Sequence, residues 1–243
     1  MNLFSVQDEE TEAELRVLMN VESLLISAGN NRPIIAACQN TLIGVYLLSN
    51  KDSFFTREEV FQLSMAVRRP HTLVQHVVPA IVHPEARWTG KQLLSCLFPS
   101  DLSLRKRTRG AKKGATCMDI DERVVVVQQG VLLAGRLCKS TCGAVEHGFV
   151  QAISVYCAGG GEVGRRHALH FVSDLQRVAS EFLNGFGFSI SLGDFRTSYE
   201  TQDKIEQTLE SLTARATAET TETGAFQIAQ KVLSVAGQVA LDG

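Results

Sequence analysis

The sequence predicts an α+β protein, in which a mixed domain of short strands and helices is followed by a C-terminal helical hairpin. Apolar residues at helical spacing behind capping residues predict several helices. Two β-branched runs joined by Gln-Gln-Gly predict an antiparallel hairpin. After Asp194 the sequence becomes polar, with narrow apolar stripes typical of paired helices. A chain of 243 residues, 44% of them hydrophobic, can bury a core of its own.

The composition argues against several classes of protein. The 24 basic and 26 acidic side chains nearly cancel, so no overall field attracts the chain to nucleic acid or membrane, and any such contact must be local. The six cysteines form no CxxC pair and no basic start precedes an apolar segment, which argues against a secreted disulfide scaffold and a signal peptide. The apolar runs are too short to span a bilayer. We expect a reduced, intracellular, soluble protein that is not secreted.

The first part of the chain is expected to hold two helices and one ambiguous apolar run. Acidic residues ahead of Leu15 predict a short helix that begins near Thr11. The run "RPIIAACQNTLIGVYLLS" fits a buried strand or a strand followed by a short helix, and its periodicity does not choose between them. Thr56 and Glu59 form a capping box ahead of a helix, whose apolar face is formed by Val60, Leu63 and Val67.

The middle of the chain combines a connector, a short helix, a basic loop and a hairpin. Three prolines between Arg68 and Pro84 predict an extended connector. Thr89 is the expected cap of a helix that ends at Pro99 and carries Leu93, Leu94 and Leu97 on one face. A solvated basic loop is expected next, formed by Arg105, Lys106, Arg107, Arg109, Lys112 and Lys113. The segment "RVVVVQQGVLLAGRLC" predicts the hairpin.

The last part of the chain is expected to alternate between strands and helices before the final hairpin. "FVQAISVYC" alternates as a strand, and Gly185 is expected to take the left-handed position at the end of the helix that follows. That helix has a predicted apolar face of Ala168, Val172, Leu175, Ala179 and Phe182. "FSISLGD" predicts a short strand. The two stripes of the hairpin are Ile205, Leu209 and Leu212, and then Ile228, Val232, Val235 and Val239.

A glycine motif raises the possibility of a dinucleotide site. Gly159, Gly161 and Gly164 spell GxGxxG between the predicted strand and a helix, where main-chain amides can cradle a pyrophosphate. However, no second βαβ half follows, and Glu162 stands where a phosphate is expected. A glycine-rich turn is the simpler interpretation.

The other site patterns are incomplete. Cys138, Cys142 and His147 offer three of the four ligands that a structural zinc needs, so we predict no zinc. No GxSxG elbow accompanies any serine. The acidic runs at 8–10 and 119–122 are expected to be solvated. The basic loop fits phosphate binding and plain solubility equally well.

Four blocks that occur in order resemble the largest subunit of multisubunit DNA-directed RNA polymerases. They are "NNRPIIAACQNTLIGVYLLSNKDSFFTREE", "WTGKQLLSCLFP", "VVVVQQGVLLAGRLCKSTCG" and "GFSISLGD". The resemblance implies that residues 1–22 are the tail of the active-site segment, residues 23–190 are the pore domain and residues 191–243 begin the funnel domain. It extends over nearly the whole chain and leaves the eukaryotic or large-DNA-virus lineage open.

The resemblance also implies a function. The chain is expected to line the pore and the channel by which nucleotides reach the magnesium active centre. In the family an Asn-Ala-Asp-Phe-Asp-Gly-Asp motif that holds the magnesium precedes this region. We therefore expect magnesium to serve the assembled enzyme without being bound by this chain, which is expected to be inactive alone and to hold no catalytic residue. The implied residues of the channel wall are Asn31, Arg32, Gln39, Lys91 and Lys139.

The implied partners are the rest of the largest subunit, the second-largest subunit and the smaller subunits, with nucleoside triphosphates, DNA template and RNA bound by the complex. No membrane contact is expected. The implied location is the nucleus for a eukaryotic source, and the host cell or virion for a viral one. The sequence departs from the family at Asn40, where aspartate is commoner, and in a shorter connector at 68–79. The alternatives are a stand-alone nucleotide-binding protein that uses the Gly159 loop and a non-enzymatic interaction module.

Overall fold

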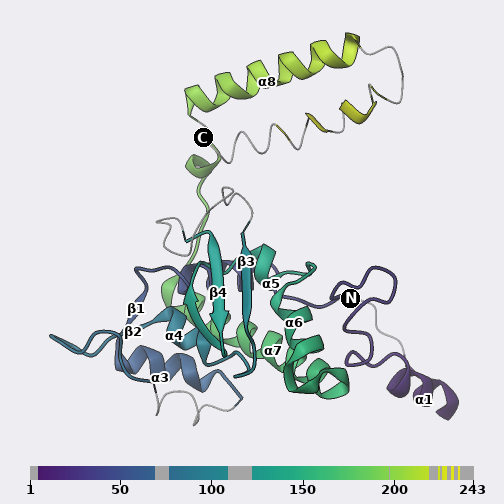
Figure 1. Cartoon of the computed structure of the whole chain (residues 1–243), viewed down its shortest axis with the longest axis vertical. Helices are drawn as coiled ribbons and strands as arrows, with labels where there is room; N and C mark the ends of the chain where they lie inside the picture. Colours follow the sequence, from purple (N-terminus) through teal and green to yellow (C-terminus); the bar gives the residue numbers. More distant parts are fainter. Residues whose placement is uncertain are drawn as a thin grey trace. The chain divides into compact units, whose positions relative to one another are not determined.

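The computed structural model describes residues 5–68, 77–108, 122–196 and 198–218, together with 224, 226–228, 231–232 and 235. The chain forms two compact units, Met1–Gly187 and Phe188–Gly243 (Figure 1). Helices and small antiparallel sheets occur together, which confirms the predicted α+β class. In the first unit the elements are α1 (Glu9–Val17), α2 (Asn40–Leu48), β1 (Phe54–Phe55), α3 (Arg57–Met65), β2 (Trp88–Thr89), α4 (Gly90–Ser95), β3 (Leu104–Arg107), β4 (Val124–Gln128), β5 (Val131–Ala134), α5 (Lys139–Cys142), α6 (Phe149–Tyr156), the 3₁₀ helix η2 (Cys157–Gly159) and α7 (Gly161–Phe186).

The first two helices differ in what they bury. Helix α1 begins at Glu9, two residues before the predicted start, and has an acidic first turn and no buried residue. The ambiguous apolar run is a helix, α2, preceded by a segment whose only strand-like pairing is the bridge between Ile26 and Pro33. Helix α2 buries a face at helical spacing, formed by Thr41, Gly44, Val45 and Leu48.

The predicted capping box at Thr56 is present, and the predicted cap Thr89 also forms a capping box. The Thr56 hydroxyl accepts from the Glu59 amide at the start of α3, and the Glu59 carboxylate accepts from the Thr56 amide at 2.8 Å. Thr89 and Gln92 repeat the arrangement at α4. Each box satisfies amides that the first helical turn leaves unpaired. Strands β1 and β2 lead into these two helices and pair with each other.

The basic segment is partly a strand, which corrects the predicted loop. Residues Arg105, Lys106 and Arg107 lie in β3, which pairs antiparallel with β4. The β3 backbone forms its hydrogen bonds with the valine-rich β4, and the charged side chains of β3 project from the sheet. Arg109, Lys112 and Lys113 lie outside the described residues. The predicted hairpin of β4 and β5 is confirmed, and Gln129 and Gly130 turn it with φ of 47° and 75°, as a type I′ turn requires.

The segment "FVQAISVYC" is helix α6, so the predicted strand is wrong. Six consecutive residues of α6, from Phe149 to Ser154, are buried. A stretch of six consecutive buried residues shows no polar face, and such an apolar run resembles a strand in the sequence. The predicted face of α7 is confirmed as buried. The helix ends two residues later than predicted. Gly187, with φ 71°, takes the left-handed position that was predicted for Gly185.

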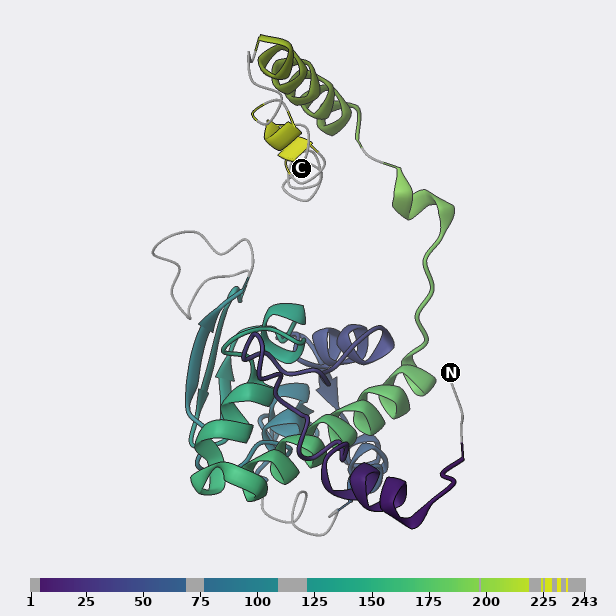
Figure 2. The same cartoon turned by 90° about the vertical axis from the view of Figure 1, so that its right-hand side faces the viewer.

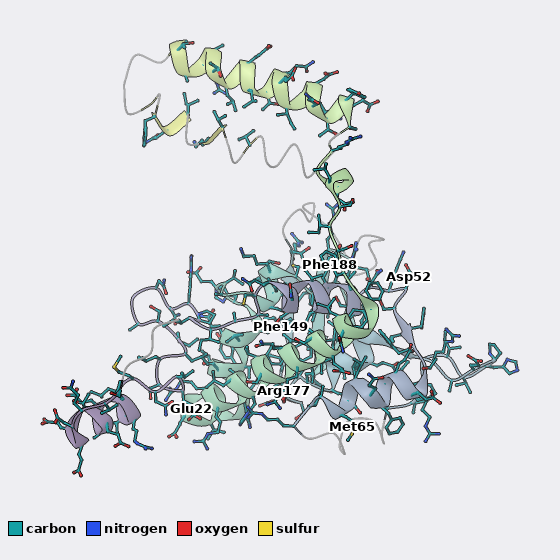
Figure 3. All side chains as sticks on the ribbon, turned by 180° about the vertical axis from the view of Figure 1, so that it is seen from behind. Glu22, Asp52, Met65, Phe149, Arg177 and Phe188 are labelled. Atoms are coloured by element: carbon teal, nitrogen blue, oxygen red, sulfur yellow. The ribbon has the colours of Figure 1, made fainter. Side chains whose placement is uncertain are left out.

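An aromatic cluster joins these elements in the core. Phe98 stacks on Phe171 of α7 with ring centroids 5.2 Å apart, and lies 4.8 Å from Phe149 of α6. Figure 3 shows Phe149 in the body of the first unit, beside α7. Figure 2 shows α7 running through this unit, with the three-stranded sheet at one side. The core therefore rests on α7, against which α2 and α6 also pack.

The second unit contains the 3₁₀ helix η3 (Leu192–Phe195) and α8 (Tyr199–Ala218). The strand predicted for "FSISLGD" is absent: residues 188–191 have no regular structure and η3 follows. A strand needs a partner to satisfy its backbone, and none pairs with this segment in the described residues. Helix α8 is the first arm of the predicted hairpin. The described residues of the second arm are helical, and Ile228, Val232 and Val235 among them are half-buried.

Candidate functional site

Two of the predicted wall residues form a tight turn before the apolar run. The Asn31 amide donates to the Ser27 carbonyl, and the Ser27 amide donates to the Arg32 carbonyl, both at 2.9 Å. Asn31 has φ 52°, and asparagine tolerates this left-handed conformation better than most residues. The turn presents the Asn31 and Arg32 side chains at the surface, while Pro33 is buried behind them.

A second left-handed turn faces the first. His147, just before α6, has φ 55°, and its amide donates to Gln151 Oε1 at 2.6 Å. Gln151 Nε2 donates in turn to the Asn31 carbonyl at 2.9 Å. The Gln151 side chain is buried, with 7% of the residue exposed, and both of its polar atoms are used to join two turns that are far apart in the sequence.

Charged side chains gather at these turns. Arg32 Nε lies 3.1 Å from Glu146 Oε1, and Lys106 Nζ donates to the Glu146 carbonyl at 2.7 Å. Burial lowers the pKa of Lys106, and the nearby Cys138 and Glu146 side chains oppose that shift. We call Asn31, Arg32, Lys106, Glu146 and Gln151 the Arg32 cluster. Residues from β3, from both turns and from α6 thus meet at one place.

Gln39 and Lys139 lie on segments that a main-chain bond holds together. The Ala37 amide donates to the Cys142 carbonyl at 3.1 Å, which ties the segment before α2 to α5. Gln39 precedes α2 with φ 46° and is exposed. Lys139, the first residue of α5, is also exposed and follows Cys138, whose thiol contributes to the electrostatics of Lys106. The structure therefore holds the segments that carry Gln39 and Lys139 together.

Lys91 has a different environment. Its ammonium group pairs with the Glu122 carboxylate, and only 14% of each side chain is exposed. The other Glu122 carboxylate oxygen, Oε2, is buried without a hydrogen-bond partner. A mostly buried pair of this kind neutralises its own charge, so Lys91 has less charge to offer a ligand than Arg32 or Lys139. Of the basic segment, Arg105 and Arg107 are exposed on β3.

The side chains of the Arg32 cluster are suited to binding an anionic ligand. It holds guanidinium and ammonium groups and carboxamides, which bind phosphate oxygens by charge and hydrogen bonds. Among the described residues, no three His, Cys, Asp or Glu side chains come together as a possible metal site. Cys142 is buried, and burial raises the pKa of its thiol to about 12; the Cys138 thiol lies 2.9 Å from the Ser140 hydroxyl.

The GxGxxG motif lacks the context of a dinucleotide site. The element before it is helix α6 and not a strand. A Cβ on Gly164 would lie 2.4 Å from the Ser154 carbonyl oxygen, so this glycine allows α7 to pack closely on α6. The motif is therefore a turn between two packed helices, as its simpler interpretation predicted.

Glu146 and Gln151 were missed in the sequence, and His147 was considered only as a zinc ligand. Gln151 is the only strongly polar side chain in "FVQAISVY", and that isolated position was a usable signal. The strand prediction did not require a hydrogen-bond partner for Gln151. In a buried helix the Gln151 side chain does require such partners. Glu146 carries no signal of its own, because its role depends on turns that are far apart in the sequence.

No helix within the described ranges is long and apolar enough to cross a membrane. Residues 24–195 match the family described as RNA polymerase Rpb1, domain 3. Over 203 residues the chain is 34% identical to DNA-directed RNA polymerase III subunit RPC1 of Bos taurus and to that of Homo sapiens, covering 80% of this chain and 14% of each relative. It is 28% identical over 221 residues to DNA-directed RNA polymerase subunit Rpo1N of Methanothermobacter thermautotrophicus, covering 88% of this chain and 23% of that protein.

The chain thus spans 14% of the length of its RPC1 relatives. The matched region includes both turns of the Arg32 cluster, helices α2 to α7 and all five strands. The match covers more than two thirds of the sequence, from the segment before the first turn to η3. The chain therefore belongs to the RNA polymerase Rpb1 domain 3 family of RNA polymerase largest subunits.

Proposed function

We propose that this chain forms part of a DNA-directed RNA polymerase and lines the pore and the channel by which nucleoside triphosphates reach the active centre. The family membership and the relatives named as polymerase subunits support this proposal. Residues 1–22 would be the tail of the active-site segment, residues 23–190 the pore domain and residues 191–243 the start of the funnel domain. The complex would also hold the DNA template and the RNA product.

The Arg32 cluster is the observation that carries the channel assignment. Arg32 lies at the Glu146 carboxylate and Lys106 at the Glu146 carbonyl, so two cations share one carboxylate-bearing residue, and Lys139 is exposed on α5. Cations therefore outnumber carboxylates here, although the chain as a whole is slightly acidic. A local excess of positive charge raises the concentration of triphosphates at a channel wall. Asn31 and Gln39 would shape the wall and offer amides to it.

The proposal assigns the chemistry to the assembled enzyme. Magnesium would be the cofactor of the complex, bound by residues other than those described here. The partners would be the rest of the largest subunit, the second-largest subunit and the smaller subunits. A eukaryotic source would put the chain in the nucleus, and a viral source in the host cell or the virion.

Assembly and nucleotide use test the two halves of the proposal. The chain would be co-expressed with the remaining segments of the largest subunit and with the other subunits, and purified through a tag on the chain. We expect co-purification of the complex. If no subunit co-purifies, the chain does not act as part of a polymerase.

The channel assignment is then tested in RNA synthesis by the purified complex. We expect Arg32→Ala to raise the KM for nucleoside triphosphates by about 3- to 10-fold with little change in kcat, because it removes attraction for the substrate and no reacting group. Arg16→Ala is the matched control, since Arg16 is an exposed arginine on α1 that pairs with Glu12. Equal KM values for the two variants would overturn the channel role of Arg32.

A further inference from the structure

The segment after α7 has the composition of a strand but pairs with nothing in the described residues. In Phe188–Leu192 the apolar residues alternate with serine, and Phe188, Ile190 and Leu192 are 51%, 60% and 82% exposed. Alternation with period two puts Phe188 and Ile190 on one side of an extended chain and Ser189 on the other, while Leu192 begins η3. Figure 3 shows Phe188 just beyond the end of α7, where the extended segment begins.

The backbone of this segment is also unsatisfied. No main-chain hydrogen bond reaches the amide or carbonyl groups of Phe188, Ser189 or Ile190 within the described part of the chain. Gly187 closes α7 on one side. On the other side the Ser191 amide donates to Asp194 Oδ2 at 2.7 Å, which starts η3. Phe188–Ile190 is thus a three-residue extended strip between α7 and η3. Its backbone groups are not paired within the described residues, and its apolar side chains, Phe188 and Ile190, lie on one side.

We infer that Phe188–Ile190 is a docking strand, which pairs with the edge of a sheet in another part of the polymerase's largest subunit. This inference rests on the proposed function. Strand addition satisfies the open backbone groups and covers the apolar side in one step. A lone two-stranded ribbon is marginal in water, so an existing sheet edge is a better partner than a second copy of this strip.

Two observations favour a partner in the same subunit. The family match ends at residue 195, directly after the strip, and the chain spans only 14% of the RPC1 relatives, so most of such a subunit lies outside these 243 residues. Strands of one polypeptide that are near in sequence commonly pair. Nucleic acid is a poor occupant, because the strip carries no cation and ends at the Asp194 carboxylate, whose pKa is lowered by its hydrogen bonds with Ser191.

Hydrogen exchange in the full chain, alone and in the co-expressed complex, tests this inference. Successive amides of a strand point to opposite sides, so only alternate amides can pair with one sheet edge. We expect either the Ser189 amide or the Phe188 and Ile190 amides to exchange freely in the chain alone and at least about tenfold more slowly in a complex with the rest of the largest subunit. A matched pair of variants at the protected position tests the pairing itself: Ser189→Pro against Ser189→Thr, or Ile190→Pro against Ile190→Val. We expect the proline variant to lower recovery of the partner segment in co-purification at least about threefold relative to its matched control.

The outcomes separate this inference from the proposed function. If the unmodified chain assembles but none of these amides is protected, or if the proline variant at the protected position assembles as well as its matched control, the docking strand is wrong and the polymerase assignment stands. Protection that appears in the chain alone at high concentration, or with the second-largest subunit alone, would identify another occupant and also overturn it. If the unmodified chain does not assemble, both proposals fail.

Discussion

Gln151 Nε2 donates a 2.9 Å hydrogen bond to the main-chain carbonyl of Asn31, and so joins helix α6 to the turn that carries Arg32. Its other polar atom accepts from the His147 amide at 2.6 Å. Both turns have a left-handed residue, and such residues persist where the surrounding structure holds them. The position of the Arg32 guanidinium therefore depends on a buried carboxamide that touches none of the charges it positions.

Replacing Gln151 should loosen this arrangement. We expect Gln151→Leu to lower the free energy of unfolding by about 1–2 kcal/mol, because it leaves a carbonyl and an amide without partners. Urea unfolding followed by the fluorescence of Trp88, the only tryptophan, measures it. Trp88 is suitable because it is buried and donates to the Val77 carbonyl. Gln176→Leu, at an exposed position of α7, is the control. Equal stability of the two variants would mean that the bridge contributes nothing.

Two glycines of the same helix should respond in opposite ways to alanine. A Cβ at Gly164 would meet the Ser154 carbonyl at 2.4 Å, whereas a Cβ at Gly185 meets nothing within 4 Å. We expect Gly164→Ala to destabilise the fold by about 1–3 kcal/mol through overpacking. Gly185→Ala should stabilise it by about 0.4–1 kcal/mol, because alanine costs less entropy in a helix. Thermal unfolding of both variants measures these changes in stability. A neutral Gly164→Ala would show that α6 and α7 do not require the close approach.

The sequence correctly predicted the elements that depend on residues close together in the chain. Thr56 with Glu59 and Thr89 with Gln92 fix two helix starts, because the capping partners lie within one turn. The failures were segments whose state depends on distant neighbours. Helix α6 (Phe149–Tyr156) buries residues 149–154 against distant elements, so its sequence shows no helical face there. Among the described residues, Phe188–Ile190 has no partner for its strand pattern.

The candidate site was only partly predictable for the same reason. Asn31, Arg32, Gln39 and Lys139 follow from the resemblance of short blocks. That Lys106 and Arg32 meet at Glu146 follows only from the fold, since three segments far apart in the sequence supply them. Lys91 carries the same charge as Lys139, but burial beside Glu122 gives it a different role that its sequence block does not reveal.

The ion pair of Lys91 and Glu122 should matter to stability more than exposed pairs do. We expect Glu122→Gln to cost about 3 kcal/mol, because it leaves the Lys91 ammonium mostly buried without a counter-charge. The comparison is Glu12→Gln, which breaks the exposed pair with Arg16 and should cost less than about 0.5 kcal/mol. Urea unfolding measures both. The double variant Lys91→Met with Glu122→Leu should lose less than Glu122→Gln, and a larger loss would contradict this account.

The cysteines should differ in reactivity as their burial dictates. Cys38 is exposed, whereas burial raises the pKa of the Cys142 thiol to about 12 from its ordinary value of 9.0. Only the thiolate reacts, so at pH 8 Cys142 in the folded chain should be alkylated at least about a thousandfold more slowly than Cys38. Pulsed iodoacetamide labelling followed by mass spectrometry of the peptides measures both rates. Labelling in urea is the control, and there the two rates should converge. Comparable rates in the folded chain would show that Cys142 is not enclosed.

The same pKa shift predicts how stability depends on alkaline pH. The unfolded chain loses the Cys142 proton above pH 9, whereas the folded chain keeps it until about pH 12. Ionisation in that window therefore favours the unfolded state, and Cys142 should contribute a loss of up to about 1.4 kcal/mol per pH unit as pH rises. Unfolding free energies at pH 8 and pH 10 measure the slope. Cys142→Ala removes the titrating group, so its slope should be shallower than that of the unmodified chain, while Cys38→Ala should leave the slope unchanged. Parallel slopes for all three proteins would mean that the Cys142 proton is not retained by folding.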